Sequence, residues 1–214
     1  METNDILKRV DHTVLKATST WEEVKILCEE ALKYHTASVC IPPAYVKRAK
    51  ENFRNLNVCT VIGFPLGYST TACKVFEAEE ALANGASEID MVVNLGDVKN
   101  GDFGLVEEEI AAVRKAVKEN VLKVIVETCY LTEDEKIELC RCVTNAKADY
   151  IKTSTGFGTA GAQLEDITLF CKHIGENVKI KASGGIRTRE AIEAFCEAGC
   201  SRIGCSSAVT ALSE

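Results

Sequence analysis

The chain has 214 residues, of which 46% are hydrophobic and 27% are charged, and its formal net charge is −7. This composition is typical of a globular protein with one sizeable core, so we expect a single domain over residues 1–214. The negative charge argues against general binding to nucleic acid. No apolar run approaches the roughly 18 residues of a membrane span, and the first residues do not resemble a signal peptide, which favours a cytoplasmic protein without a membrane partner.

Apolar segments typical of strands alternate with amphipathic helical segments along the whole chain. In chain order, we expect strands over residues 10–13, 38–41, 58–62, 88–93, 121–126, 150–152, 178–182 and 202–205. We expect helices over residues 21–34 and 43–52, and a third helix that ends near residue 84. Further helices are expected over residues 102–119, 132–146, 163–174 and 188–198, with a last helix from about residue 206. Regular alternation without hairpin signals favours parallel strands, and eight such units predict a compact (β/α)8 TIM barrel. A doubly wound sheet is the alternative, but no G-x-G-x-x-G follows the first strand.

Eleven cysteines raise the question of a disulfide or metal framework. No two cysteines stand at C-x-x-C spacing, their number is odd, and the three histidines are not spaced as zinc ligands. Most of the cysteines lie within apolar segments, where a reduced cysteine behaves as a small hydrophobic residue. We therefore expect reduced thiols in a reducing compartment, and no metal site.

Two lysines each end a short apolar segment and precede a run of small residues. Lys152 precedes residues 153–156, and Lys181 precedes residues 182–185. Burial favours the neutral amine of a lysine, and two ammonium groups on neighbouring strands disfavour each other. Because a neutral lysine amine attacks carbonyl carbon atoms, the pair predicts Schiff-base chemistry. The alternative is that both lysines are structural and extend their ammonium groups to solvent.

Other polar residues stand near the carboxyl ends of the expected strands, where the catalytic residues of such a barrel lie. Asp11 and Thr13 belong to the first strand, Asp90 to the fourth, and Glu127 follows the fifth. Carboxylates around two lysines could offset the cost of burial and move protons. Asp90 could instead be only a structural partner of a lysine, and Asp11 and Thr13 part of a capped turn. For Cys40, packing is the simpler interpretation, because no base stands near it in the sequence.

Glycines and hydroxyl groups follow the last two expected strands, in residues 183–187 and 204–208. Backbone N–H groups and a helix N-terminus at this place form the phosphate site of many sugar-phosphate barrels. The glycines at 156 and 158 could add further amides after the sixth strand. Plain turns are the alternative interpretation.

The segments 62–67, 88–94, 150–158 and 180–187, together with residues 11–13 and Lys16, resemble deoxyribose-phosphate aldolase in the order of that family. The resemblance implies a class I aldolase that needs neither a metal nor another cofactor. It implies reversible cleavage of 2-deoxy-D-ribose 5-phosphate to D-glyceraldehyde 3-phosphate and acetaldehyde, in the catabolism of deoxyribose phosphates.

Residue by residue, the resemblance implies that Lys152 forms the Schiff base, that Lys181 keeps it nucleophilic, and that Asp90 relays protons. Expected contacts of the substrate and its phosphate are Asp11, Thr13, Cys40, Gly156, Gly184, Gly185, Arg187, Gly204, Ser206 and Ser207. Phe157 stands where some members of the family have a lysine, which removes one cation from the phosphate site.

Two other functions stay open. Another sugar-phosphate barrel enzyme, such as an isomerase, would use Glu127 or Asp90 as its base and would not need a neutral Lys152; a different Schiff-base aldolase is a further variant of this alternative. A non-catalytic phosphate-binding barrel would have no reason to keep a costly lysine pair. We expect a sugar phosphate as the small-molecule partner and a homo-oligomer, most simply a dimer.

Overall fold

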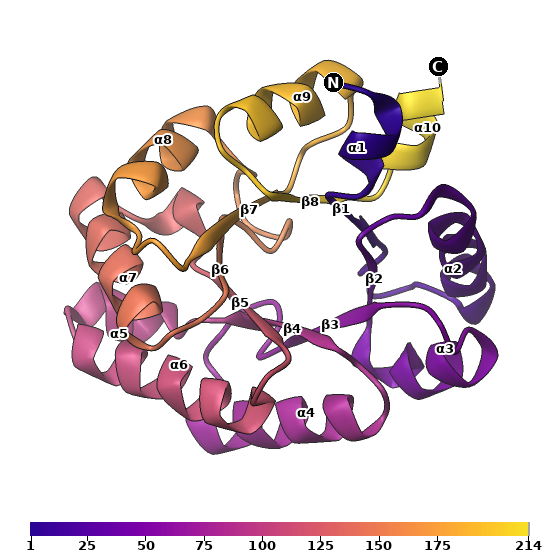
Figure 1. Cartoon of the computed structure of the whole chain (residues 1–214). Helices are drawn as coiled ribbons and strands as arrows, with labels where there is room; N and C mark the ends of the chain where they lie inside the picture. The colour runs from indigo at the N-terminus through magenta and orange to yellow at the C-terminus, as the bar shows by residue number, and fades with distance from the viewer. Residues whose placement is uncertain (214) are drawn as a thin grey trace.

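The computed structural model describes residues 1–213 of the chain, and Glu214 lies outside them. Eight parallel strands form a closed barrel in which each strand pairs with the next and β8 pairs with β1. Figure 1 shows the barrel with its helices around the outside. The strands are β1 (Val10–Thr13), β2 (Ser38–Ile41), β3 (Val58–Ile62), β4 (Glu88–Val92), β5 (Val121–Ile125), β6 (Tyr150–Lys152), β7 (Lys179–Ser183) and β8 (Arg202–Cys205). The predicted (β/α)8 barrel is therefore confirmed.

The helices surround the barrel and connect successive strands. They are α1 (Thr3–Leu7), α2 (Trp21–Tyr34), α3 (Val46–Asn52), α4 (Thr71–Ala83), α5 (Leu95–Asn100), α6 (Phe103–Val117), α7 (Glu133–Asn145), α8 (Leu164–His173), α9 (Arg189–Glu197) and α10 (Ala208–Ser213), with 3-10 turns at η1 (Pro43–Tyr45) and η2 (Thr128–Tyr130). None of the helices within residues 1–213 combines the length and the apolar character needed to cross a membrane.

Three local features differ from the sequence expectation. The helix expected over residues 43–52 is divided into the 3-10 turn η1 and α3. In η1, the Tyr45 hydroxyl donates to the Ser19 carbonyl oxygen at 2.8 Å, which connects this turn to the loop after β1. The helices α1 and α5 were not predicted. Each is too short to show an apolar period, and α1 is held by tertiary burial of Ile6 and Leu7.

Capping boxes fix where two of the helices begin. In α2, the Thr20 side chain accepts from the backbone N–H of Glu23, and the Glu23 carboxylate accepts from that of Thr20. Thr132 and Glu135 form the same pair of bonds at α7. Both boxes have the Thr-x-x-Glu spacing that is typical of helix N-termini, and they satisfy N–H groups that a helix N-terminus leaves unpaired.

Successive side chains along each strand alternate between the interior of the barrel and the core between the barrel and its helices. Outward-facing side chains such as Leu122 and Val124 join the large hydrophobic core between the barrel and its helices. The inward-facing side chain between them is Lys123, which is fully buried. Barrel interiors are commonly filled by branched apolar side chains, so charged groups inside this one call for an explanation.

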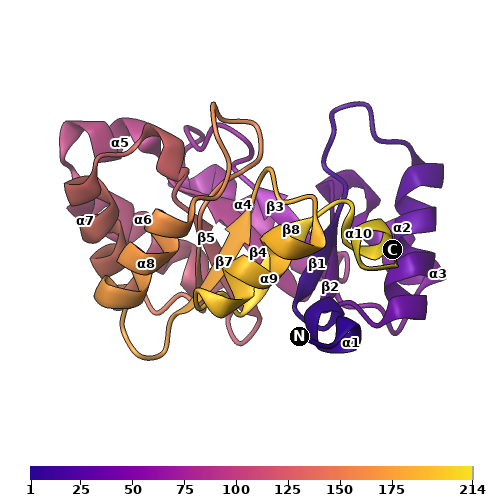
Figure 2. The ribbon, with the colours of Figure 1, turned by 90° about the horizontal axis from the view of Figure 1, so that it is seen from above.

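Figure 2 shows the two ends of the barrel. The loops after β1 and β6 project on one side, and α1 lies on the opposite side. Because the strands are parallel, all of their carboxyl ends meet on the side of these loops. The candidate site is therefore expected there.

Candidate active site

A cluster of charged side chains, here called the barrel cluster, occupies the barrel interior. Its seven members come from six strands and are Asp11, Glu88, Asp90, Lys123, Lys152, Lys181 and Arg202. A buried charge is tolerated only when it is paired and hydrogen-bonded. The members of the cluster meet this condition through one another.

Asp90 lies at the centre of the barrel cluster. Its Oδ2 atom accepts hydrogen bonds from the Nζ atoms of Lys152 and Lys181, both at 2.7 Å. Its Oδ1 atom accepts from Lys123 Nζ at 2.8 Å and from the Cys59 thiol at 3.1 Å. Asp90 therefore bridges the two lysines that the sequence analysis selected, which are direct partners in the register of β6 and β7.

Asp11 and Glu88 support the lower part of the cluster. Asp11 accepts from Lys181 Nζ and, through its other oxygen, from Arg202 and from the Ser38 hydroxyl at 2.7 Å. Glu88 pairs with Arg202 at 3.0 Å and with Lys123. Each cation of this layer therefore has at least two carboxylate neighbours.

The surrounding charges determine the protonation of the cluster. Burial by itself would raise the pKa of Asp90, but the ammonium groups of Lys123, Lys152 and Lys181 outweigh it and hold that pKa well below its usual range. Burial would lower the pKa of Lys181, yet Asp11 and Asp90 outweigh it and raise that pKa. Lys181 is therefore cationic and Asp90 anionic at neutral pH.

The charges of the barrel cluster do not balance. Four basic groups face three carboxylates, which leaves one excess positive charge if every group is ionised. Such an excess is costly in a medium of low polarity, and loss of one proton removes it. Of the four basic groups, only Lys152 lines the cavity above the cluster. Lys152 is thus the basic group of the cluster that a ligand in the cavity can contact.

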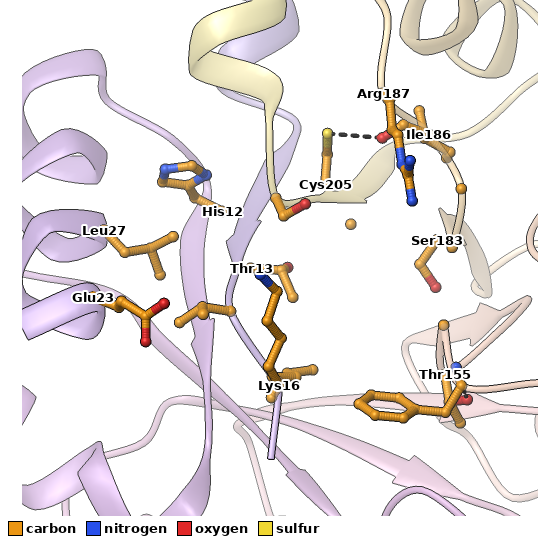
Figure 3. Close-up of a pocket in the computed structure, with 18 of the residues that line it drawn as sticks. His12, Thr13, Lys16, Glu23, Leu27, Thr155, Ser183, Ile186, Arg187 and Cys205 are labelled. Carbon is orange, nitrogen blue, oxygen red and sulfur yellow. Dashed lines mark hydrogen bonds between the residues drawn. The ribbon is translucent and has the colours of Figure 1, made fainter. Parts of the chain in front are cut away.

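A cavity of about 630 Å³ opens above Lys152 at the carboxyl ends of the strands. Figure 3 shows Thr13, Lys16 and His12 on one side of it and Ser183, Arg187 and Thr155 on the other. The cavity wall also includes most of the predicted phosphate contacts, which are Gly156, Gly184, Gly185, Gly204 and Ser206.

Close packing fixes the loops that follow β7 and β8. Gly184 has a positive φ of 86°, and a Cβ atom there would lie 3.0 Å from the Cα atom of Gly161. A Cβ atom on Gly204 would lie 2.9 Å from that of Ser183. The Cys205 thiol donates to the Ile186 carbonyl oxygen at 3.1 Å, which joins the two loops (Figure 3). The loops therefore form one preorganised wall.

Glu127 does not face the cavity, contrary to the expectation that it lies at the barrel mouth. The strand β5 ends at Ile125, and Glu127 has a left-handed backbone with φ of 56°, which breaks the alternation of the strand. Its carboxylate accepts from the Thr155 backbone N–H at 3.1 Å and from the Thr155 hydroxyl. Burial raises the pKa of Glu127, although the bonds from Thr155 and the charge of Lys152 act to lower it. Glu127 thus holds the loop after β6.

Four predicted residues lie elsewhere than expected. Lys181 is not at the end of its strand, because β7 continues to Ser183, so Lys181 lies below the cavity wall. Asp11 is fully buried within the barrel cluster, where it contacts Lys181 instead of lining the cavity. Ser207 is not in the cavity wall, and its hydroxyl lies 3.5 Å from the Arg187 carbonyl oxygen.

Cys40, the fourth, is fully buried beside Cys59 and Val61. The neighbouring Cys59 side chain is the main cause that lowers the pKa of Cys40, while burial raises the pKa of Cys59. All eleven cysteines are free thiols in this structure.

Three members of the barrel cluster were not among the candidates from the sequence, namely Glu88, Lys123 and Arg202. The sequence carried a signal for Glu88 and Lys123, whereas only the register of β7 and β8 locates Arg202. Glu88 stands two residues before Asp90, so period two places both inside the barrel. Lys123 interrupts an apolar strand, and Arg202 is the register partner of Lys181.

Within residues 1–213, two groups of side chains bring three ligand atoms within 4.8 Å of one another, and both lie in this region. One is Cys40, Cys59 and Asp90, and the other is Asp11, Cys59 and Glu88. The carboxylates of both groups already accept bonds from lysine or arginine. A metal ion there would have to displace these cations, so neither group is assigned as a metal site.

Comparison with known proteins places this closed barrel among the aldolases. The family model described as DeoC/LacD family aldolase matches residues 6–206. The chain belongs to this family.

Individual relatives are similar over almost their whole length. A Clostridioides difficile (strain 630) protein named deoxyribose-phosphate aldolase is 60% identical over 203 residues, which cover 94% of this chain and 93% of the relative. A Clostridium botulinum (strain Alaska E43 / Type E3) protein of the same name is 57% identical, with 98% and 95% covered. The solved structure of a tetrameric deoxyribose phosphate aldolase from Aeropyrum pernix superposes with a TM-score of 0.91 at 32% identity, covering 99% of this chain and 91% of the other.

Proposed function

We propose that this chain is a class I aldolase that reversibly cleaves 2-deoxy-D-ribose 5-phosphate to D-glyceraldehyde 3-phosphate and acetaldehyde, as a step in deoxyribose phosphate catabolism. Membership of the aldolase family and the names of its relatives support the substrate. The observation that carries the mechanism is the position of Lys152, which contacts Asp90 in the barrel cluster and also lines the cavity.

The reaction begins with the neutral amine of Lys152. Its nitrogen attacks the aldehyde carbon C1 of the open-chain sugar, and loss of water from the carbinolamine with uptake of one proton leaves a protonated imine. The excess positive charge of the barrel cluster favours the neutral amine before this step. Lys181, kept protonated by Asp11 and Asp90, supplies part of that excess.

Bond cleavage follows at the imine stage. The C3 hydroxyl gives its proton to the Asp90 carboxylate, the C2–C3 bond breaks, and its electron pair forms the C1–C2 double bond of an enamine while D-glyceraldehyde 3-phosphate leaves. Protonation of the enamine at C2 and hydrolysis then release acetaldehyde and restore Lys152. Asp90 contacts both lysines at 2.7 Å, so we assign it the relay of protons between the imine nitrogen and Lys181.

The substrate phosphate occupies the end of the cavity lined by the loops after β7 and β8. Backbone N–H groups of Gly184 and Gly185, the Arg187 guanidinium and the Ser206 hydroxyl are groups that bind phosphate, and all four residues line the cavity. Thr13 and Gly156 also line the cavity. In this arrangement Asp11 and Cys40 act from beneath, Asp11 through Lys181 and Cys40 through packing.

The two alternative functions have less support. An isomerase with Glu127 as its base would need that carboxylate in the cavity, but Glu127 holds Thr155 instead. A non-catalytic binder would gain nothing from a cluster with an excess of buried cations, which costs stability.

Reductive trapping tests the proposal. Borohydride added with acetaldehyde should label the protein permanently, and peptide mapping should find the label on Lys152. The Lys152→Arg variant should fold, take up no label, and lose activity by a factor of about a thousand or more, because arginine is not deprotonated. Labelling at another lysine, or near-normal cleavage by Lys152→Arg, would overturn the mechanism.

We further infer that residues 1–214 act as one catalytic domain, in a cytoplasmic setting that keeps the thiols reduced, and that the chain forms a homo-oligomer. The Aeropyrum pernix relative is described as a tetramer. Large apolar side chains exposed on one stretch of this chain, Leu66, Tyr68 and Phe76, are candidates for burial between subunits. Light scattering of the purified protein would give the number of subunits.

A further inference from the structure

Lys16 lies in the loop after β1, and its side chain extends into the cavity toward Thr13 (Figure 3). Among residues 1–213, its ammonium has no hydrogen-bond or ion-pair partner. A cation that faces a cavity without a protein partner is available to an anionic ligand.

Arg187 faces the same cavity from the opposite wall (Figure 3). Its guanidinium also has no carboxylate partner among the described residues. The two carboxylates that line the cavity are engaged locally. Glu23 accepts from the Thr20 backbone N–H at 2.7 Å, and Glu30 lies 2.7 Å from His12 Nε2. The free charges facing the cavity between these walls are therefore positive.

Three contacts hold the backbone of the loop that carries Lys16. The Lys16 carbonyl oxygen accepts from the Ser19 backbone N–H at 3.0 Å. The Ser19 carbonyl oxygen accepts from the Tyr45 hydroxyl at 2.8 Å, and the capping box of α2 begins at Thr20. A loop fixed in this way spends less conformational entropy when Lys16 binds a ligand.

The opposite loop supplies no cation at residue 157. Phe157 lines the cavity and packs edge-on against Phe64, with ring centroids 5.4 Å apart. A phosphate held by the loops after β7 and β8 would thus meet Arg187 on one side and uncharged aromatic surface on another. The second negative charge of the phosphate then needs a cation from another part of the cavity wall.

We propose that Lys16 is this second cation and a specificity-determining residue for phosphorylated substrates. The proposal rests on the aldolase function and adds to it a residue outside the loops after β6, β7 and β8. Lys16 and Arg187 then hold the phosphate between opposite walls of the cavity. The distance from Lys152 to this pair of cations therefore sets the length of substrate that the site accepts.

The alternative is that Lys16 serves only Glu23. The hydrogen bonds from Thr20 are the main cause that lowers the pKa of Glu23, and the charge of Lys16 contributes less. In that case Lys16 would support the start of α2, and its replacement would change stability but not the preference for phosphate.

The test compares Lys16→Gln with Lys25→Gln, which makes the same charge change on the exposed face of α2, where Lys25 pairs with Glu29 and does not line the cavity. Both are assayed with 2-deoxyribose 5-phosphate and with 2-deoxyribose. For Lys16→Gln, the ratio of kcat/KM between the two substrates should fall roughly 10- to 100-fold, mainly through KM, the range expected for one charge-assisted hydrogen bond. Lys25→Gln should leave this ratio unchanged, and Lys16→Arg should recover most of it.

Calorimetric titration with inorganic phosphate separates this proposal from the proposed function. Weaker phosphate binding by Lys16→Gln than by Lys25→Gln supports the role of Lys16 even if the wild-type chain fails to cleave 2-deoxyribose 5-phosphate. Equal phosphate binding by the two variants, or an equal loss with both sugars, would overturn the role of Lys16 while leaving the aldolase assignment intact.

Discussion

Lys152 and Lys181 are in register on neighbouring strands, yet their surroundings give them different chemistry. Lys181 lies between Asp11 and Asp90, two carboxylates that raise its pKa. Lys152 has only Asp90 as a carboxylate partner in the ion pairs of the described chain, and it lines the cavity. Repulsion between two lysines is therefore an incomplete account of the pair, because the shared carboxylate of Asp90 lies between them.

Replacing Lys181 with methionine tests this balance. The variant has three cations and three carboxylates, so the cluster is neutral with Lys152 protonated, and Asp90 has one cation fewer to share. We expect cleavage at neutral pH to fall and partial recovery as the pH is raised, because deprotonation restores the amine. The rate of imine formation with acetaldehyde, measured against pH, should shift toward alkaline pH by about one unit or more, which corresponds to ~1.4 kcal/mol.

Lys181→Arg is the matched control for this prediction. It keeps the positive charge, so its pH profile should stay closer to that of the wild type even if the rate is lower. A profile for Lys181→Met that does not move would show that Lys181 acts in another way, for example as a direct proton donor.

At the scale of elements, α4 and α6 are joined by a buried ion pair. Lys74 on α4 donates to Glu109 on α6 at 2.8 Å and to the carbonyl oxygen of Val92 at the end of β4, also at 2.8 Å. Burial is the largest influence on both groups, lowering the pKa of Lys74 and raising that of Glu109. The pair therefore positions the two helices at a net cost in desolvation.

The predicted consequence is strong coupling between the two residues. Glu109→Leu or Lys74→Met alone should destabilise the fold by about 3–5 kcal/mol, because each leaves a buried charge unpaired, whereas the double variant should recover much of that loss. Lys99→Met, which removes a partly exposed ion pair with Glu135, should cost only about 0–1 kcal/mol. Urea unfolding of the four variants measures this, and additive single changes would contradict it.

For the whole molecule, the barrel cluster links stability to pH. The pKa of Asp90 lies well below the ordinary value of 3.8, and that of Asp11 is lowered as well, by Lys123, Lys181 and Arg202 against the effect of burial. Below pH 3.8 the unfolded chain binds these protons while the folded chain does not, so folding stability must fall as the pH falls.

We therefore expect the free energy of unfolding to be maintained above about pH 4 and to decrease below it by ~1.4 kcal/mol per pH unit for each of the two carboxylates. Urea unfolding at a series of acidic pH values measures this slope. Because the cluster is buried, added salt should change the slope little. A free energy of unfolding that does not change between about pH 4 and pH 2 would show that the cluster is not ionised in the folded state.

The sequence predicted the elements where local periodicity is strong. The range of α2 and the capping boxes at Thr20 and Thr132 follow from short-range spacing and agree with the structure. The short helices α1 and α5 were not predictable, because tertiary burial rather than an apolar period stabilises them. The position of Lys181 was misjudged by two residues, since Ala182 and Ser183 continue β7 with side chains that are equally typical of a loop.

By itself, the sequence determined the eight strand–helix units and the candidacy of Lys152, Lys181 and Asp90, because all of these depend on local pattern and residue chemistry. Closure of the barrel decided the rest. It brings Asp11 into contact with Lys181, 170 residues away, and with Arg202, 191 residues away. Glu127 is turned away from the cavity by its own left-handed backbone. Which carboxylates pair with which cations depends on these long-range contacts, and no local pattern encodes them.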